Sequence, residues 1–408
     1  MKCRHCQQEL TLPLVDLATA PPSNAYLTQD KLHAPEKYFP LRVMVCTQCW
    51  LVQTEDYAGA DELFDEDYAY FSSFSSTWLK HAEKYVSDMV ERFGLNAHSH
   101  IIEVASNDGY LLQYAKARGI PCLGIEPTAS TAQAARAKHL EIIEEFFGVK
   151  LAKQLAAQGK QADLTAANNV LAHVPDINNF VGGFATLLKP AGVATFEFPH
   201  LLNLIEQNQF DTIYHEHYSY LSLTAVQTIF MANGLAVFDV EELPTHGGSL
   251  RVYAQRSDVG QRPTSPNVAH LLAREKAVGM TGEAFYAHFQ TRADKVKNDL
   301  LQFLLETKQE GKTVAGYGAA AKGNTLLNYA GVRPDLLPYV VDINPAKQNK
   351  FLPGCRIPIV SEAQLKQTRP DYVIILPWNL SNEVIEQLAY IREWGGKFVT
   401  AVPSLKIN

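Results

Sequence analysis

The fold is decided by the stretch His100-Ile101-Ile102-Glu103-Val104-Ala105-Ser106-Asn107-Asp108-Gly109, a short apolar strand that runs into a polar turn. A helical segment follows, and Pro121-Cys122-Leu123-Gly124-Ile125-Glu126 then forms a second strand that ends in an acid. Two strands joined through one helix predict a βαβ unit of a parallel sheet. Glu126 lies about 20 residues beyond the first strand, where a carboxylate can accept both hydroxyl groups of a ribose.

The turn after the first strand indicates which cofactor this unit binds. It contains one glycine, Gly109, where a dinucleotide fingerprint needs three. The turn is therefore poorly suited to the pyrophosphate of NAD, and it suits S-adenosylmethionine, which carries no phosphate. The residues expected to contact this cofactor are Glu103, Ala105, Asn107, Gly109, Glu126, Asn168 and Asn169.

Two further strands are predicted at residues 162–167 and 192–199, and a polar turn follows the first of them. Strand ends on one edge of an open sheet form the ligand crevice, so Asn168, Asn169 and His173 should face it. The alternative for His173 is a helix-start residue that bonds only to backbone.

A hairpin and a helix complete this part of the pattern. Two glycines and the alternation over residues 249–254 predict the final antiparallel strand of a methyltransferase-type sheet. Before the first strand, apolar residues recur at helical spacing from Trp78 to Phe93, with Ser76 or Thr77 as N-cap and Gly94 as the end.

Residues 198–220 crowd three His, two Glu and three Tyr into the middle of the chain. A His has an ordinary pKa near ~6.5, so it can act as a base close to neutral pH. A proton next to a ketone can be removed when the developing enolate oxygen is stabilised, and Glu216 could orient an imidazole for this step. His215 and His217 would share one face of an extended strand, so alternation alone does not separate them.

Four of the six cysteines form two C-x-x-C turns, Cys3 with Cys6 and Cys46 with Cys49. Paired cysteines in a chain without a secretory signal suggest a metal before a disulfide. The two turns supply four thiolates for tetrahedral zinc and leave no open position, so the expected role is structural. The alternatives are a redox motif, which normally occurs once and at a helix start, or free structural cysteines.

A second Rossmann-like half is predicted near the C-terminus. Residues 313–325 indicate a strand, a glycine turn and a helix. Gly316 and Gly318 let the backbone approach a phosphate, while the helix N-terminus and Lys322 favour the anion. We expect a nucleotide diphosphate here, and the alternative is a tight turn without a ligand. The residues expected around the substrate are His215, His246, Gly316, Gly318, Lys322, Asn324, Asp342 and Trp378.

These segments predict an α/β protein with three domains. The domains are an N-terminal zinc-binding module (1–66), a central Rossmann-like S-adenosylmethionine methyltransferase domain (67–265) and a C-terminal second Rossmann-like domain (266–408). The last domain begins with a linker and with one long helix, which helical periodicity extends from Phe285 to an end at Gly311.

Composition narrows the class of partner. The chain has 408 residues, is 47% hydrophobic and has a formal net charge of −7. An acidic chain without a basic run is a poor candidate for binding nucleic acid or a membrane surface. No apolar run approaches the ~18 residues that span a bilayer, and the N-terminus lacks the apolar core of a secretory signal. We expect a cytoplasmic protein that acts as a monomer.

Seven distinctive stretches follow one another along nearly the whole chain. They are the paired cysteines and residues 103–109, 124–127, 169–176, 214–220, 246–251 and 316–323. With them the chain resembles the nucleotide-sugar C-methyltransferase family over nearly its whole length. The His-Glu-His run and the glycine turn with its lysine are the specific elements, because paired cysteines and glycine-poor turns also occur elsewhere.

The resemblance implies methylation by S-adenosylmethionine of the carbon next to the C-4 ketone of a dTDP-linked 4-keto-deoxysugar, at C-3 or sometimes at C-5. It implies that His217 is the base, with Tyr214, Glu216, His173 and Tyr68 as supporting residues. Two nucleotide-binding halves around one His cluster fit this chemistry, because holding both reactants turns a two-substrate encounter into a positioned one.

Two other classes of function are left open by the residues. One is an NAD-dependent nucleotide-sugar oxidoreductase that uses the C-terminal half, although a third glycine of the fingerprint is absent there. The other is an inactive zinc-containing interaction protein, against which the intact Glu126 and His cluster argue. A metal site at the cluster would be unusual, because its spacing is not H-E-x-x-H.

Overall fold

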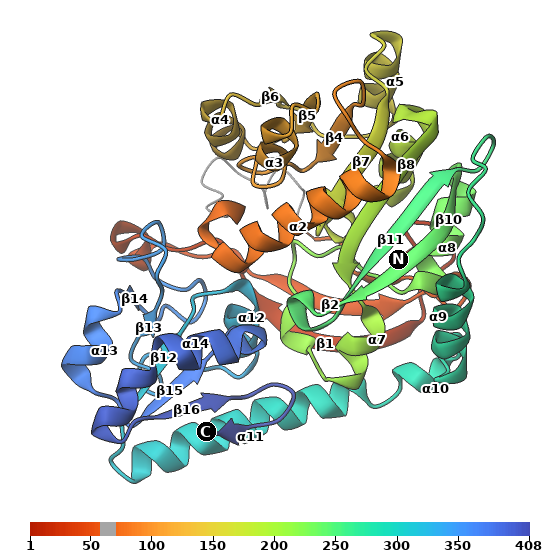
Figure 1. Ribbon diagram of the computed structural model, residues 1–408. Coiled ribbons are helices and arrows are strands. Elements are labelled where there is room, and N and C mark those ends of the chain that lie inside the picture. The colour runs from red at the N-terminus through yellow and green to blue at the C-terminus, as the bar shows by residue number, and fades with distance from the viewer. Residues whose placement is uncertain (58–70) are drawn as a thin grey trace.

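The computed structural model describes residues 1–57 and 71–408 and contains three β-sheets with helices around them (Figure 1). The predicted α/β class, with a zinc-binding module and two Rossmann-like sheets, is confirmed. Tyr68 and the predicted boundary between residues 66 and 67 lie outside the described residues.

The central sheet has seven strands in the order β10-β11-β8-β7-β4-β5-β6. The strands from β6 to β8 are parallel, and β11 runs antiparallel between β8 and β10. The predicted hairpin strand is therefore confirmed as β11. The bounds are β4 (Ile101–Val104), β5 (Cys122–Ile125), β6 (Glu141–Ile143), β7 (Ala162–Asn168), β8 (Leu188–Pro199), β10 (Leu235–Leu243) and β11 (Ser249–Arg256).

Strand order in this sheet reverses at β4. The chain passes from β4 to β5 and β6 on one side, and then returns to β7 and β8 on the other. Ligands of open parallel sheets bind outside the carboxyl ends of the strands at such a reversal. The turn after β4, Glu126 after β5 and Asn168 at the end of β7 therefore lie where a ligand is expected.

Helices cover both faces of the central sheet. They are α2 (Ser76–Phe93), α3 (Leu112–Ala117), α4 (Ala129–Ala137), α5 (Val149–Ala157), α6 (Ile177–Leu187), α8 (Leu223–Ala232) and α9 (Pro266–Ala277). Helix α7 (Leu201–Glu206) packs instead in the core that the N-terminal and C-terminal sheets share. The N-cap of α2 is Ser75, whose Oγ accepts from the N–H of Trp78, one residue before the predicted Ser76. The helix ends at Gly94 (φ 65°), as predicted.

The N-terminal sheet has the order β1-β2-β3-β9. Its strands are β1 (Leu12–Ala20), β2 (Phe39–Val45), β3 (Val52–Thr54) and β9 (Ser219–Tyr220). The last strand comes from the central part of the chain and pairs with β3, with Val52 opposite Tyr220 and Gln53 opposite Ser219. The segment that follows the His-Glu-His run is thus built into the N-terminal module.

The C-terminal sheet has the order β14-β13-β12-β15-β16-β17, and only β17 is antiparallel to its neighbour. Strand order reverses again, here at β12. Its strands are β12 (Val314–Tyr317), β13 (Val340–Val341), β14 (Ile359–Val360), β15 (Tyr372–Ile375), β16 (Lys397–Thr400) and β17 (Lys406–Ile407). Its helices are α12 (Ala321–Tyr329), α13 (Ala363–Thr368) and α14 (Ser381–Gln387).

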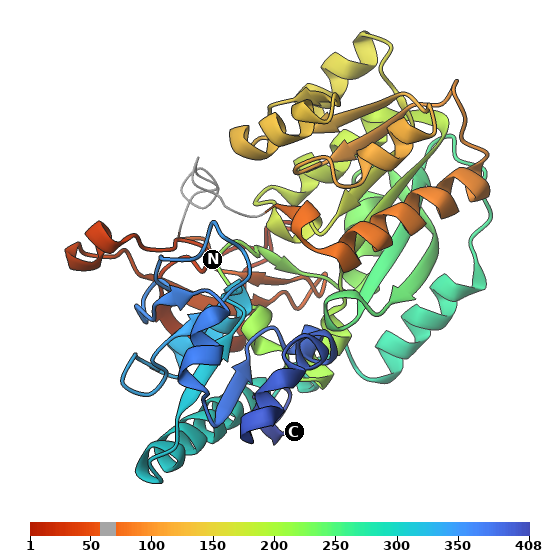
Figure 2. The ribbon, with the colours of Figure 1, turned by 60° about the vertical axis from the view of Figure 1, so that its left-hand side comes forward.

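The predicted single long helix is divided into α10 (Glu283–Tyr286) and α11 (Phe289–Gln309). His288 separates them because its φ of 67° is left-handed and interrupts the helical backbone. Helix α11 runs along the C-terminal sheet (Figure 1) and buries one apolar face in a core shared with β1 and β12. That shared core joins the N-terminal and C-terminal modules, which lie side by side in Figure 2.

Within the described residues, seven short helical turns lie in the loops. They are η1 (Gln29–His33), η2 (Ser72–Phe74), η3 (Leu171–His173), η4 (Phe210–Thr212), η5 (Thr245–Gly247), η6 (Trp378–Leu380) and η7 (Ala389–Trp394). Four of these, η3 to η6, carry side chains of the candidate active site.

Candidate active site and metal centre

The four paired cysteines converge. Their Sγ atoms all lie within 4.8 Å of one another, and the Cys3–Cys49 and Cys6–Cys46 pairs are 3.6 and 3.5 Å apart. A tetrahedron with Zn–S bonds of about 2.3 Å has sulfur atoms about 3.8 Å apart, so the cluster fits zinc. Gln53 Nε2 donates to Cys3 Sγ at 3.3 Å and would help hold that ligand.

The first cysteine turn braces the loops of the candidate active site. The guanidinium of Arg4 donates to Pro175 O at 2.9 Å and lies 5.2 Å from the ring centre of Tyr218. His5 Nδ1 lies 2.7 Å from Asn178 Oδ1. The zinc-binding module thus supports both the loop after β7 and the segment that follows His217.

The turn after β4 has an unusual backbone. Ala105, Asn107 and Gly109 all have positive φ angles, of 57°, 49° and 76°. A Cβ at Gly109 would lie 2.2 Å from Leu140 Cδ1, so no larger residue fits there. The N–H of Asn107 donates to Glu126 Oε2 at 2.8 Å. The acid at the tip of β5 therefore also holds the turn.

Buried polar atoms without well-formed hydrogen bonds lie beside this turn. Both carboxylate oxygens of Glu103, and both side-chain polar atoms of Asn168, lack a well-formed hydrogen bond within the described residues, and the hydroxyl of Tyr110 is the polar group beside both. Burial raises the pKa of Glu103 well above its ordinary value. Leaving such atoms unpaired costs about 1–3 kcal/mol each, which a ligand with hydroxyl and amino groups would offset. These residues therefore fit S-adenosylmethionine.

His217 is held by a backbone carbonyl. Its Nδ1 lies 2.9 Å from Thr212 O, and because a carbonyl only accepts, Nδ1 carries the proton and Nε2 the lone pair. The ring centres of His173 and Tyr214 lie 4.6 and 4.0 Å from that of His217. Burial, reinforced by His173, lowers the pKa of His217 well below its ordinary value. The ring is therefore neutral near neutral pH.

Two further imidazoles share this environment. Burial lowers the pKa of both His173 and His246 to about 4. His246 Nε2 lies 3.2 Å from the side-chain nitrogen of Asn169. This contact ties Asn169, just after β7, to the loop that carries His246. His173 lies beside His217, with the two ring centres 4.6 Å apart.

His215 and Glu216 do not join the ring of His217. The N–H of His217 donates to Tyr214 O at 2.9 Å and closes a turn, and strand β9 begins only at Ser219. The expectation that alternation points both histidines the same way is therefore wrong. His215 Nε2 donates to Phe39 O at 3.3 Å instead, on the side of strand β2.

Glu216 is buried, and burial raises its pKa. Its Oε1 accepts from Asn24 Nδ2 at 3.1 Å, and its Oε2 has no partner among the described residues. The carboxylate thus does not orient the imidazole of His217, because the carbonyl of Thr212 has that position. Glu216 remains close to the cluster through its backbone carbonyl, which His173 contacts.

The C-terminal crevice gathers a lysine, a tryptophan and a buried acid. Lys322 Nζ donates to Asn379 Oδ1 at 2.7 Å and lies 4.7 Å from the ring centre of Trp378. Trp378 Nε1 donates to Asp211 Oδ2 at 2.8 Å. Asp211 is fully buried, and burial raises its pKa to about 6. This contact joins the C-terminal sheet to the loop before His217.

The remaining predicted substrate residues lie around the start of α12. Gly318 has a φ of 86°, and a Cβ there would lie 2.4 Å from Pro377 Cδ. A Cβ at Gly316 would clash with a side chain of the neighbouring strand β13. Asp342 Oδ2 accepts from the N–H of Ala319 at 2.8 Å, and Asn324 is buried with Nδ2 unpartnered among the described residues.

Sequence reasoning missed an aromatic wall at the crevice. The ring of Trp78 lies 4.8, 5.9 and 5.3 Å from the rings of His81, Tyr110 and His246. His81 in turn contacts Glu197, a fully buried acid near the end of β8, at 2.8 Å. Trp78 fitted the apolar face of a helix, so nothing in its spacing pointed to this position.

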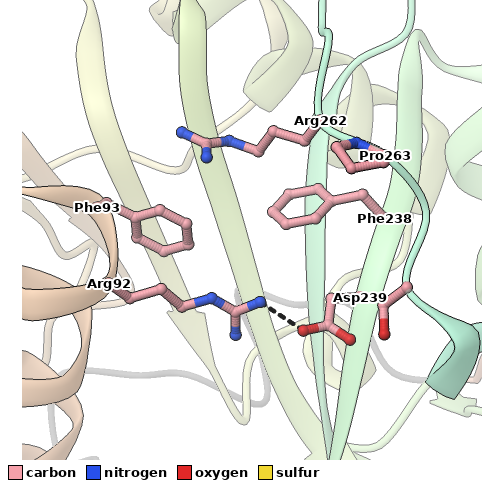
Figure 3. A pocket seen from close by; sticks show the side chains of 7 residues that line it. Arg92, Phe93, Phe238, Asp239, Arg262 and Pro263 are labelled. Atoms are coloured by element: carbon pink, nitrogen blue, oxygen red, sulfur yellow. Dashed lines mark hydrogen bonds and ion pairs between the residues drawn. The ribbon is translucent and has the colours of Figure 1, made fainter.

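A cavity of about 220 Å³ lies away from both crevices (Figure 3). It is lined by Arg92, Phe93, Phe238, Asp239, Arg262, Pro263 and Ser265. Arg92 pairs with Asp239 across it and so ties the end of α2 to the middle of β10. Because it is not at the carboxyl ends of the strands, it is not where the sheet places its ligand.

Comparison with known proteins then decides the family. Family models match residues 3–64 (zinc binding domain), 78–240 (methyltransferase domain) and 244–403 (C-methyltransferase C-terminal domain). The chain is 34% identical to C-methyltransferase NovU of Streptomyces niveus over 406 residues, which covers 100% of this chain and 96% of NovU. The chain belongs to the C-methyltransferase family. It is an S-adenosylmethionine-dependent enzyme, so neither the oxidoreductase nor the inactive protein is retained.

Solved structures resemble part of this C-methyltransferase. Magnesium protoporphyrin IX methyltransferase from Synechocystis, with bound SAH, covers 44% of this chain and 83% of its own (16% identity, TM-score 0.36). The PH0226 protein from Pyrococcus horikoshii covers 46% and 95% (13% identity, TM-score 0.39). Likenesses this weak say nothing about function, so the family assignment rests on the domain models and NovU.

The length and apolarity of the helices decide whether any of them could span a membrane. Within residues 1–57 and 71–408, no helix of this C-methyltransferase is both long and apolar enough to cross a membrane.

Proposed function

We propose that this C-methyltransferase acts on the carbon next to the C-4 ketone of a nucleotide-linked 4-keto-deoxysugar. C-3 is the proposed position, C-5 is the alternative, and dTDP is the proposed nucleotide. One observation carries the proposal: the loop that holds His217 reaches both sheets, because the ring of His217 lies 4.6 Å from that of His173 after β7, and Asp211 accepts from Trp378 Nε1 after β15 at 2.8 Å. A base so placed can serve a substrate that reaches from one crevice to the other.

The chemistry begins at Nε2 of His217. This atom takes the proton from the carbon next to the ketone, and the electron pair of the C–H bond moves into the ketone to give an enolate. Tyr214 and His173 flank His217 and are proposed to donate to the enolate oxygen. Tyr68 remains a further proposed donor outside the described residues. The low pKa of His217 then favours release of the proton to solvent.

The central crevice supplies the methyl donor. Glu126, with Glu103 and Asn168 beside it, is proposed to hold the ribose and amino groups of S-adenosylmethionine. S-Adenosylmethionine supplies an electrophilic methyl group, and its sulfur keeps the electron pair of the bond that breaks. The enclosing side chains Trp78 and His246 would keep water from the carbanion.

The C-terminal crevice is proposed to hold the diphosphate. Helix α12 presents its N-terminal N–H groups after the turn at Gly318, which favours an anion. Within the described part of the chain, Lys322 makes no contact ion pair; its Nζ donates to Asn379 Oδ1, and the buried Asp211 is the nearby carboxylate. Burial lowers the pKa of this ammonium group, and a diphosphate would add negative charge beside it.

A panel of nucleotide 4-ketosugars, incubated with S-adenosylmethionine and analysed by product mass and NMR, tests the proposal. One ketosugar should gain a single methyl group at the carbon next to its ketone. Methylation at an oxygen or nitrogen, or equal turnover of sugars without the ketone, would contradict the proposed function.

A further inference from the structure

Two hydrogen bonds reach from the C-terminal domain to the loop before His217. Trp378 Nε1 donates to the side chain of Asp211 at 2.8 Å. Thr325 Oγ1 donates to the backbone carbonyl of Ile213 at 2.9 Å. The donor Trp378 lies in η6, which follows β15, and the donor Thr325 lies in α12, which follows β12. These strands are neighbours in the C-terminal sheet, so one domain holds the loop at two points.

The residue between these two points is Thr212. Its carbonyl accepts from Nδ1 of His217 at 2.9 Å and fixes the tautomer of that ring. A carbonyl is turned by small rotations of the peptide on either side of it, and here both neighbours are anchored. The orientation of the imidazole thus depends both on bonds within the loop, where the N–H and Oγ1 of Thr212 donate to Gln209 O, and on the two contacts made by another domain.

Burial makes these two contacts hard to replace by water. Asp211 is 0% exposed and Thr325 is 3% exposed. The ring of Trp378 packs on Gly247 so closely that a Cβ there would lie 2.6 Å from it. Loss of either donor would therefore leave a buried acceptor unpaired and free the loop to move.

We propose that Trp378 and Thr325 are positioning residues for His217. Their hydrogen bonds hold the Thr212 carbonyl in place, so that Nδ1 keeps its proton and the lone pair stays on Nε2. This inference rests on the proposed function, in which His217 is the base. It also gives Trp378 a different role from the substrate contact that the sequence suggested.

Two variants of the full-length chain remove one donor each. Trp378→Phe keeps an aromatic ring and deletes the N–H, and Thr325→Val keeps the shape and deletes the hydroxyl. Trp394→Phe is a matched control, because Trp394 Nε1 donates to Pro370 O at 3.1 Å in the same domain, away from the loop. Thr325→Ser keeps the hydroxyl and loses only the methyl group, so its kcat and KM should stay near those of the wild type.

Kinetics separate positioning from substrate binding. Each of the two variants is expected to lower kcat about 3- to 10-fold, as loss of one buried hydrogen bond would, and to leave KM for the sugar nucleotide nearly unchanged. A rise in KM without a fall in kcat would mean that Trp378 contacts the substrate, and it would overturn the proposal. So would a loss no larger than that of Trp394→Phe.

NMR of protein labelled with ¹⁵N-histidine tests the positioning without any turnover. His217 should show a protonated Nδ1 in the wild type and a mixture of tautomers in Trp378→Phe and Thr325→Val. An unchanged His217 signal in both variants overturns the proposal. If the His217 signal changes in Trp378→Phe and Thr325→Val while a separate His217→Asn variant keeps its activity, the positioning role stands and His217 is rejected as the base.

Discussion

The central and the C-terminal sheets reverse their strand order in the same way, yet the turns at the two reversals differ in charge. The central turn lies beside Glu103 and Glu126, whose carboxylates can accept hydrogen bonds. The C-terminal turn leads into α12 and carries Lys322. In the proposed function, topology therefore sets the place of each ligand, and the residues of the turn set whether it suits a ligand that donates hydrogen bonds or an anion.

The acid at the tip of the second strand does not distinguish the two crevices. Glu126 accepts from the N–H of Asn107, and Asp342 accepts in the same way from the N–H of Ala319. In both sheets this acid holds the turn that precedes it. The two crevices differ in Lys322. The contrast between them can therefore be tested by changing one residue in each crevice, Glu126 or Lys322, and by measuring the affinity of each variant for both ligands.

Removal of zinc should have the largest effect, because the N-terminal module holds the segment between the crevices. Thr54 Oγ1 donates to His217 O at 3.0 Å, and β3 pairs with β9. Structural zinc contributes about 10–16 kcal/mol to folding in small domains. Elemental analysis should give about one zinc per chain, and chelation should abolish activity. Metal-free protein that keeps its fold with four free thiols would contradict the zinc site.

Glu126→Ala should weaken binding of S-adenosylmethionine about 10- to 100-fold, because hydrogen bonds to a charged group contribute about 1.5–3 kcal/mol. Binding of the sugar nucleotide should change little. Calorimetric titration of both ligands measures the two affinities, with Glu126→Gln as the control that keeps one acceptor. Equal loss of both affinities would show a folding defect and would remove the contrast between the crevices.

Lys322→Ala should raise KM for the sugar nucleotide about tenfold and lower kcat less, because the diphosphate lies far from the reacting carbon. Binding of S-adenosylmethionine should stay the same. Steady-state kinetics at two salt concentrations measure this, with Lys308→Ala, which removes an exposed lysine that pairs with Asp335 in the same domain, as the control. Unchanged binding of the nucleotide diphosphate to Lys322→Ala would reject the assignment.

The smallest expected effect concerns pH. The base must be neutral, and the pKa of His217 in the folded enzyme is lowered, so activity should be retained above that pKa and lost as the pH falls through it. The acidic limb of kcat/KM should therefore lie below about pH 6.5, the ordinary pKa of His. Asp211 has a pKa of about 6 and would titrate in the same pH range. The pH profile of Asp211→Asn separates the two groups, because an acidic limb that remains in this variant belongs to His217.

Local patterns predicted β4, β5, β7, β8, β11, β12 and the cysteine cluster, because alternation, helical spacing and C-x-x-C turns are short-range signals. They did not predict that β9 pairs with β3, or that His288 divides the long helix. The first depends on residues far apart in the chain, and the second on one backbone angle.

The same limit applies to the candidate site. Strand-end reasoning placed His173 at the ligand edge of the sheet, and only the family resemblance joined it to His217; the structure places their rings 4.6 Å apart. Nothing in the sequence predicted that the carbonyl of Thr212 orients His217, or that Trp378 reaches Asp211. A backbone carbonyl has no sequence signature, and an interdomain contact depends on how two modules pack.

The central claim is that His217 removes the proton next to the ketone. Exchange of that proton with solvent deuterium, measured without methyl donor, tests it most directly. His217→Asn should slow the exchange by a factor of about 10² to 10⁴ while both ligands still bind, and His215→Asn should exchange at nearly the wild-type rate. If His217→Asn exchanges at the wild-type rate and His215→Asn does not, the base is His215 and the account is wrong.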